Sequence, residues 1–260
     1  MIPAASITAW GTTRPWPSRA AIEQDLLLAR TIVAIYEHPD LRDELVFRGG
    51  TCLHQVHLEA PRRYSEDLDF VRSTHSGIGP VFDALRQVAA MVGLVVARTD
   101  IGQHPKLVMR GAAEDDPTLP LRVKVEINTQ ETSPVRPLVR LPFVVTSNWF
   151  NGSADVLTFT PAELVSTKLR ALYQRSKGRD LFDLWLALTE LHLEPAEILD
   201  CFGPYRPVGY TAEVAGMNLD AKLQNRTFVT DLELLVASWP EGYNVASAAR
   251  LIMDELLAHL

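Results

Sequence analysis

The chain has 260 residues, a formal charge of −7 at pH 7 and two cysteines, Cys52 and Cys201. The acidic balance excludes a generally basic coat for nucleic acid, and the two cysteines give neither a disulfide framework nor the spacing of a zinc site. No apolar run reaches the roughly 20 residues that a membrane helix requires, and the N-terminus lacks the pattern of a signal peptide. We therefore expect a cytoplasmic protein in which both cysteines are buried as small apolar residues.

The predicted elements divide the chain into an arm, an α/β domain and a helical domain. Residues 1–18 contain three prolines and are expected to form an irregular arm. Residues 19–159 are expected to form the α/β domain, because helices and strands alternate there. Helical spacing over 18–39 is followed by a strand up to residue 50 and the start of a helix. A strand over 66–71, a helix closed by Gly93 and several more strands come next. Residues 160–260 are expected to be helical, beginning with Thr160 as N-cap, Pro161 at the first helical position and Glu163 completing a capping box. The fold class is therefore α+β, with a mixed sheet in the N-terminal domain.

Two aspartates, Asp67 and Asp69, lie on the strand predicted over 66–71. Side chains at i and i+2 of a strand face the same way, so both carboxylates point together, with Ser65 beside them, while Leu68 and Phe70 face the core. Adjacent carboxylates repel each other, and neither tolerates burial alone. Mg²⁺ relieves both problems, because it prefers oxygen ligands and is usually held by one or two carboxylates together with phosphate oxygens. The alternative is a solvated strand end that carries two ordinary acidic residues.

A Gly-Gly-Thr turn, formed by Gly49, Gly50 and Thr51, connects a predicted strand to a predicted helix. Successive glycines let backbone N–H groups approach a phosphate, and a helix N-terminus adds a favourable field; a tight turn alone would explain the two glycines equally well. Arg63 precedes the aspartates and is expected to pair with a phosphate or with the carboxylates. The combined order of strand, Gly-Gly-Thr, helix and Ser-x-Asp-x-Asp strand favours a phosphate and metal site more strongly than any single piece.

A third carboxylate, Glu126, lies on the polar face of the alternating segment "LRVKVEINTQ". Because this segment is predicted to be a central strand, Glu126 is a candidate for the same metal site. A half-exposed strand would show the same alternation.

Five cationic residues and no acidic residue occur between Lys168 and Arg179. Lys168 and Arg175 share a helical face, and the run supplies a local basic patch that the acidic total charge conceals; the alternative is a solvated helix face. Asp180 and Asp183 follow, one helical turn apart. Arg179 and Asp183, four residues apart, are spaced to form an ordinary exposed ion pair.

Three segments, "GGTCLHQVHLEAPRRYSEDLDF", "KVEIN" and "TPAELVSTKLRALYQRSKGRDLFDL", together resemble the AbiEii/MenT nucleotidyltransferase-like toxins of the DNA polymerase β-type nucleotidyltransferase superfamily. The resemblance covers roughly residues 22–190. It implies a nucleotidyltransferase-like catalytic domain over 19–159, a helical domain that completes the active site, and a separate AbiEi-like antitoxin as partner. It also implies transfer of nucleotides from an NTP to the 3′ end of tRNA, which blocks aminoacylation and translation. We expect a monomer without membrane association.

The resemblance further implies roles for residues in its first segment. Gly49, Gly50 and Thr51 match the nucleotide-phosphate loop, with threonine where many members have serine. Ser65 matches a serine that is a phosphorylation target in some members, and with Arg63 it is expected to contact the nucleotide. Asp67 and Asp69 match the metal-binding aspartates.

The later segments carry the remaining roles that the resemblance implies. Lys168 matches the residue that holds the triphosphate, with Arg175 beside it. Asp180 and Asp183 match an Arg-Asp-x-x-Asp element, and Glu126 matches the third carboxylate only loosely.

The expected chemistry is nucleotidyl transfer, with an NTP as substrate and Mg²⁺ as cofactor, or Mn²⁺ as the alternative metal. Either Glu126 or Asp183 is expected to take the proton of the attacking ribose hydroxyl. Two other classes of function stay open. One is an enzyme of the same superfamily that modifies a protein or a small molecule; the other is a binding protein that has lost turnover, against which the retention of Ser65, Asp67, Asp69 and Lys168 argues.

Overall fold

The structure is a computed structural model that describes residues 2–114, 116, 118–130 and 133–260. The chain forms two compact units. The described residues of Met1–Pro134, together with Leu138–Thr158, form unit 1, and Val135–Pro137 with Phe159–Leu260 form unit 2.

Unit 1 is built on a mixed sheet of seven strands in the order β3-β4-β5-β2-β1-β7-β6. The strands β2 and β5 run parallel, as do β1 and β7, and the other neighbours run antiparallel. The predicted fold class is thereby confirmed. The strands are β1 (Leu45–Arg48), β2 (Asp67–Arg72), β3 (Val95–Asp100), β4 (Lys106–Ala112), β5 (Pro120–Asn128), β6 (Val139–Thr146) and β7 (Asn151–Thr158).

The helices of unit 1 include one that the sequence did not predict. They are α1 (Ala4–Gly11), α2 (Arg19–Glu37), α3 (Gly49–Cys52), the π-helix η1 (Leu53–His57) and α4 (Gly79–Met91). The expectation of an irregular arm over residues 1–18 is wrong for α1, because the three prolines lie outside that helix, where they do not break it. The indole N–H of Trp10 in α1 donates to a carboxylate oxygen of Asp25 in α2 at 2.8 Å, which fixes α1 against α2.

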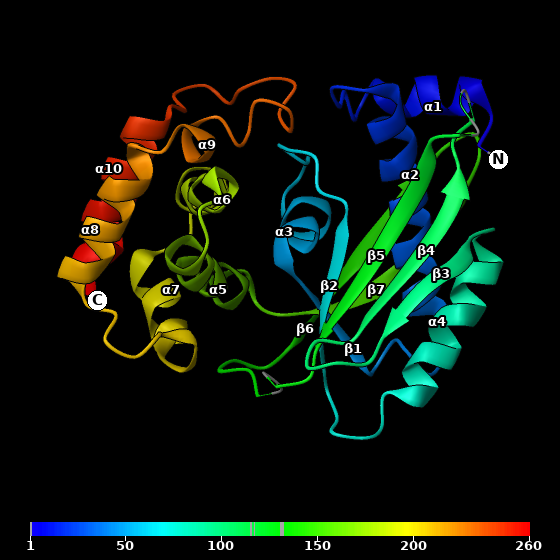
Figure 1. Ribbon diagram of the computed structural model, residues 1–260, viewed down its shortest axis with the longest axis horizontal. Coiled ribbons are helices and arrows are strands. Elements are labelled where there is room, and N and C mark those ends of the chain that lie inside the picture. Colours follow the sequence, from blue (N-terminus) through cyan, green and yellow to red (C-terminus); the bar gives the residue numbers. More distant parts are fainter. Residues whose placement is uncertain (1, 115, 117, 131–132) are drawn as a thin grey trace. The chain divides into compact units, whose positions relative to one another are not determined.

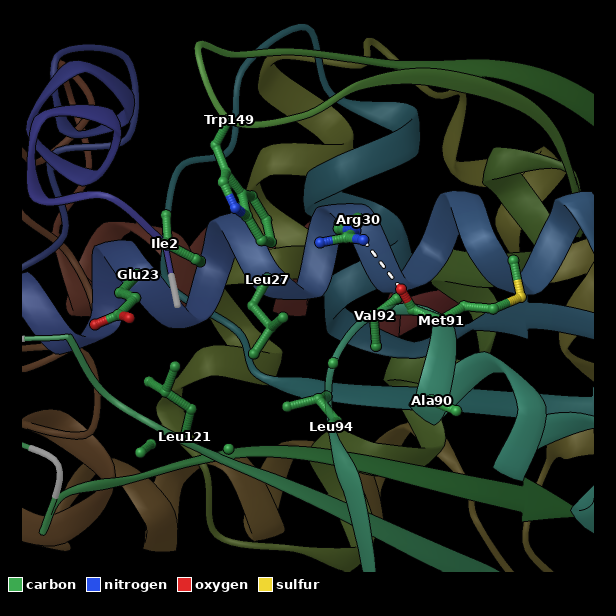
Figure 2. Close-up of a pocket in the computed structure, with 13 residues that line it drawn as sticks. Ile2, Glu23, Leu27, Arg30, Ala90, Met91, Val92, Leu94, Leu121 and Trp149 are labelled. Carbon is green, nitrogen blue, oxygen red and sulfur yellow. Dashed lines mark hydrogen bonds between the residues drawn. The ribbon is translucent and has the colours of Figure 1, made fainter.

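The helices α2 and α4 pack against one face of the sheet (Figure 1). A cavity of about 290 Å³ lies beside α2 and the end of α4, and Figure 2 shows the side chains that line it. Leu27 and Leu94 supply apolar lining, and the guanidinium of Arg30 lies 4.7 Å from the centre of the Trp149 ring. Arg30 also donates to the carbonyl oxygen of Met91 at 3.0 Å. None of the candidate site residues lines this cavity.

Unit 2 is helical, as predicted. Its helices are α5 (Pro161–Gln174), α6 (Gly178–Thr189), α7 (Pro195–Phe202), the 3-10 turn η2 (Gly203–Tyr205), α8 (Ala212–Leu223), α9 (Arg226–Val229), α10 (Val245–Glu255) and the 3-10 turn η3 (Leu257–His259). Among the described helices of both units, none is long and apolar enough to cross a membrane.

The start of α5 differs from the predicted capping box. Thr160 is the N-cap and Pro161 the first helical residue, but the Thr160 side chain makes no capping hydrogen bond. The Glu163 carboxylate instead accepts hydrogen bonds from the backbone N–H groups of Val135 (2.7 Å) and Arg136 (2.9 Å) and from the Tyr205 hydroxyl (2.7 Å). Glu163 is fully buried, so these distant donors satisfy its charge better than the nearby end of the helix.

Candidate active site

The strand β2 presents its two aspartates to one face and its apolar residues to the other. Leu68 and Phe70 are buried, and the Phe70 ring stacks on Phe47 with the ring centres 5.1 Å apart. Asp67 and Asp69 are only partly buried. The alternation predicted from the sequence is therefore confirmed, and both carboxylates lie on the same side of the sheet.

The Gly-Gly turn lies directly against this carboxylate face. Arg48 at the end of β1 pairs in register with Asp69, and Gly49 follows with φ of +80°, a conformation that favours glycine. A Cβ on Gly49 would overlap the Asp69 carboxylate, and a Cβ on Gly50 would overlap the guanidinium of Arg63. Both glycines are therefore required by close approach, and the turn brings its backbone next to one carboxylate and one cation.

Buried polar side chains pack next to the Gly-Gly turn and hydrogen-bond to neighbouring residues. Thr51 is almost fully buried, and its hydroxyl donates to the carbonyl oxygen of Asp67 at 2.5 Å and lies 2.9 Å from the Ser65 hydroxyl. Arg63 is also buried, and its guanidinium donates to the carbonyl oxygen of Tyr64 at 3.2 Å. The structure thus brings the turn, Arg63, Ser65 and the aspartates into one site within unit 1.

Glu126 lies next to this site but binds two lysines. It pairs in register with Asp69 across the parallel strands β2 and β5. Its carboxylate lies 3.0 Å from the Lys124 ammonium and 3.1 Å from the Lys106 ammonium, and Lys124 also lies 2.7 Å from Asp67 Oδ2. Partial burial raises the pKa of Glu126, but hydrogen bonds from Lys124 and Lys106 outweigh it, so the net pKa is lowered and Glu126 is ionised.

Lys124 is a candidate site residue that the sequence reasoning missed. It pairs in register with Asp67, and its alternation in phase with Glu126 in "KVEIN" was the available signal. Burial lowers the pKa of Lys124, but hydrogen bonds and charge from Asp67 and Glu126 outweigh it and raise the pKa above its ordinary value. The Lys124 ammonium is therefore charged and offsets part of the negative charge of Asp67 and Glu126.

The donor set on β2 fits a hard divalent cation. Asp67 and Asp69 supply carboxylate oxygens on one face, and the described residues contain no cluster of three or more histidine, cysteine, aspartate or glutamate side chains with metal-binding geometry. A site with two carboxylates leaves the other coordination positions to phosphate oxygens and water, which is the usual arrangement for Mg²⁺ in nucleotide enzymes.

The candidate residues of unit 2 form a buried ion-pair cluster between α5 and α6. The Lys168 ammonium lies 2.8 Å from Asp183 Oδ2 and 3.7 Å from Asp180 Oδ1, and Asp180 also accepts two hydrogen bonds of 2.6 Å from the Arg175 guanidinium. The side chains of Asp180 and Asp183 are fully buried, and that of Lys168 is 4% exposed. Two positive and two negative charges balance within the cluster, which ties α5 to α6.

The exposed ion pair that helical spacing suggested between Arg179 and Asp183 does not form. The Arg179 guanidinium donates to both carboxylate oxygens of Asp231, at 3.0 and 3.1 Å. Asp183 is instead on the buried side of α6, facing Lys168. Burial rather than spacing along the helix decides which partner each side chain finds.

Comparison with known proteins identifies the family. A family model described as "Nucleotidyl transferase AbiEii toxin, Type IV TA system" matches residues 30–246. The chain belongs to the AbiEii family. This AbiEii chain is therefore a nucleotidyltransferase toxin of a toxin–antitoxin system, which uses an NTP as substrate and has an antitoxin as partner. No curated protein matches it.

One solved structure shows the same fold as the AbiEii chain. The nucleotidyltransferase toxin MenT4 from Mycobacterium tuberculosis superposes with a TM-score of 0.65 at 17% sequence identity, covering 100% of this chain and 91% of MenT4. An antigenic nucleotidyltransferase-like protein from Paracoccidioides brasiliensis gives a TM-score of 0.38 at 18% identity, covering 80% of this chain and 93% of that one, a likeness too low to bear on the fold.

Proposed function

We propose that this AbiEii toxin transfers nucleotides from an NTP to the 3′ end of tRNA in a Mg²⁺-dependent reaction, and so blocks aminoacylation and translation. The observation that carries the proposal is the placement of Asp67 and Asp69 on one face of β2, with Asp69 directly against Gly49 of the Gly-Gly turn. Bound to the two aspartates, Mg²⁺ (or Mn²⁺) would offset the charge that develops as pyrophosphate leaves.

The residues of unit 1 have complementary roles in this proposal. The backbone N–H groups of Gly49 and Gly50 bind phosphate oxygens, and the buried Arg63 beneath Gly50 adds positive charge. The hydroxyls of Thr51 and Ser65 fix the turn against β2. A phosphate on Ser65 would add about −1.5 to −2 charge beside two carboxylates and would block the nucleotide, as expected from the resemblance.

We assign the proton acceptor to Glu126 rather than Asp183. Glu126 is ionised and lies next to Asp69 in register, whereas the Asp183 carboxylate is fully buried against Lys168. The resemblance to the family is the sole support for a triphosphate-binding role of Lys168 and Arg175, because in unit 2 both are bound to carboxylates.

The family description supports an antitoxin as the second partner, because it names a type IV toxin–antitoxin system. We propose that this partner is a separate AbiEi-like protein and that the toxin itself acts as a monomer in the cytoplasm, where NTP and tRNA are available.

Labelled transfer tests the proposal directly. The protein is incubated with each α-labelled NTP, Mg²⁺ and total tRNA, and the RNA is separated on a denaturing gel. We expect label in tRNA with one or more NTPs, and none after periodate oxidation of the 3′ ribose or with the Asp67→Asn variant. Label in oxidised tRNA, equal label with Asp67→Asn, or label in no RNA would each overturn the proposal. Label in a protein or small molecule would instead support the other enzyme class of the superfamily.

A further inference from the structure

Five cations lie on the sheet of unit 1 on the same side as Asp67 and Asp69. They are Arg98 on β3, Lys106 and Arg110 on β4, and Arg122 and Lys124 on β5, and we call them the cationic face. Strand register places them together, because Lys124 pairs with Asp67, Lys106 pairs with Glu126, and Arg110 pairs with Arg122. Residues paired across neighbouring strands project to the same face.

Two members of the cationic face oppose each other without compensation. Arg110 and Arg122 are directly opposite on antiparallel strands, and both are exposed. Their Cβ atoms are therefore about 5 Å apart, and like charges at this spacing destabilise a sheet. Within the part of the chain that the structure describes, neither guanidinium has a carboxylate partner. An arrangement that repels itself in isolation becomes favourable when an anion binds between the two arginines.

The backbone of Arg122 is held firmly despite this repulsion. The Gln24 side chain of α2 donates to the carbonyl oxygen of Arg122 at 2.5 Å and accepts from its N–H at 2.9 Å. Gln24 is buried. This buried clamp fixes the strand that presents Arg122, so the exposed guanidinium extends from a rigid base.

Each of the other three cations of the cationic face, unlike Arg110 and Arg122, has a carboxylate partner. Lys106 and Lys124 bind Glu126 and Asp67, and Arg98 lies 3.7 Å from Asp100. Between them lies a groove of about 270 Å³ with the buried Val108 in its lining. Arg122 and Glu126 also line this groove, so it connects one of the two uncompensated arginines to the carboxylate that pairs in register with Asp69.

We propose that the cationic face binds the ribose-phosphate backbone of the RNA acceptor and leads its 3′ end to Asp67 and Asp69. This inference rests on the proposed function. From β2 to β3 the face is about 14 Å wide, since neighbouring strands lie about 4.8 Å apart, which accommodates two or three consecutive phosphates. The segments Val95–Asp100, Lys106–Ala112 and Pro120–Asn128 contain no aromatic residue for base stacking. The face therefore contacts the backbone and not the bases, and it recognises RNA independently of sequence.

The test compares three double variants with the wild type. Arg110→Gln/Arg122→Gln removes the uncompensated charges, and Arg110→Lys/Arg122→Lys keeps them. The control, Arg42→Gln/Arg86→Gln, removes the same charge from two exposed arginines that already pair with carboxylates, Asp43 and Asp83. Binding of fluorescent tRNA is measured between 50 and 200 mM salt, together with KM for tRNA and for the NTP.

Loss of two phosphate contacts should lower the slope of log K against log salt by about 1.4–1.8 and weaken tRNA binding about 20-fold at 0.15 M salt. We expect this result for the double glutamine variant, with KM for the NTP unchanged, and near wild-type binding for the lysine variant and the control. An unchanged salt slope in the double glutamine variant, in a wild type that does label tRNA, would overturn the inference and leave the proposed function standing. If the double glutamine variant lost binding to the antitoxin but kept wild-type binding to tRNA, the inference would also be overturned. A wild type that labels no RNA would overturn both.

Discussion

Replacing Lys168 with methionine should lower the free energy of unfolding of unit 2 by about 3–5 kcal/mol. The substitution preserves most of the volume of the side chain but removes the ammonium that lies 2.8 Å from Asp183 Oδ2 and 3.7 Å from Asp180 Oδ1. Asp180 keeps its two hydrogen bonds from Arg175, so the loss falls mainly on Asp183. Because Asp183 is fully buried, the substitution removes a positive charge 2.8 Å from a carboxylate that water cannot reach, and breaking a buried pair in this way costs about 3–5 kcal/mol.

Urea unfolding followed by circular dichroism measures this loss. The matched control is Lys177→Met, because Lys177 is 46% exposed and lies 3.8 Å from Asp231, and an exposed pair contributes about 0–1 kcal/mol. The double variant Lys168→Met/Asp183→Leu replaces the pair with apolar side chains and should recover most of the stability. If Lys168→Met and Lys177→Met unfolded at the same urea concentration, the cluster would not hold α5 and α6 together, and our reasoning on unit 2 would be wrong.

Three further predictions concern unit 1. Asp69→Asn should lower the rate of nucleotidyl transfer roughly 100-fold or more and leave the urea midpoint near that of the wild type, because Asp69 is only partly buried; a wild-type rate would contradict its role. Gly49→Ala should lose both stability and turnover, whereas Gly93→Ala, with the same positive φ but open space around it, should lose only about 1 kcal/mol of stability; equal effects on turnover would refute the close-approach argument. Burial lowers the pKa of His57 from 6.5 to about 4. As the pH falls, His57 is therefore protonated in the unfolded state before it is protonated in the folded state. The free energy of unfolding should then fall by about 3 kcal/mol between pH 6.5 and pH 4, and His57→Gln should flatten this dependence while the exposed His104→Gln should not.

The strand patterns of the candidate site could be predicted because they are local. Alternation with a period of two placed Asp67 and Asp69 opposite Leu68 and Phe70, and the burial along β2 agrees. The same reasoning put Glu126 on the polar face of β5, where the structure has it. Each of these conclusions needs only neighbouring residues.

Partners that lie far apart in the chain could not be predicted in this way. Glu126 binds Lys106 because β4 and β5 pair in one particular register, and no local pattern states that register. Likewise, Arg179 finds Asp231, which is 52 residues away. The strand β7 was also missed, since its exposed N-terminal half is polar and it forms only by pairing with β6 and β1.

The hydrogen bonds of the Glu163 carboxylate limit where the chain can be cut into fragments that fold separately. The segment Val135–Pro137 belongs to unit 2, although the residues on both sides of it in sequence belong to unit 1. A fragment that begins at Phe159 would therefore lack the two N–H groups that Glu163 accepts from, and it would bury that charge with fewer donors. Separating the units by a single cut should yield an unstable helical half, whereas supplying residues 133–137 as a peptide should restore its fold.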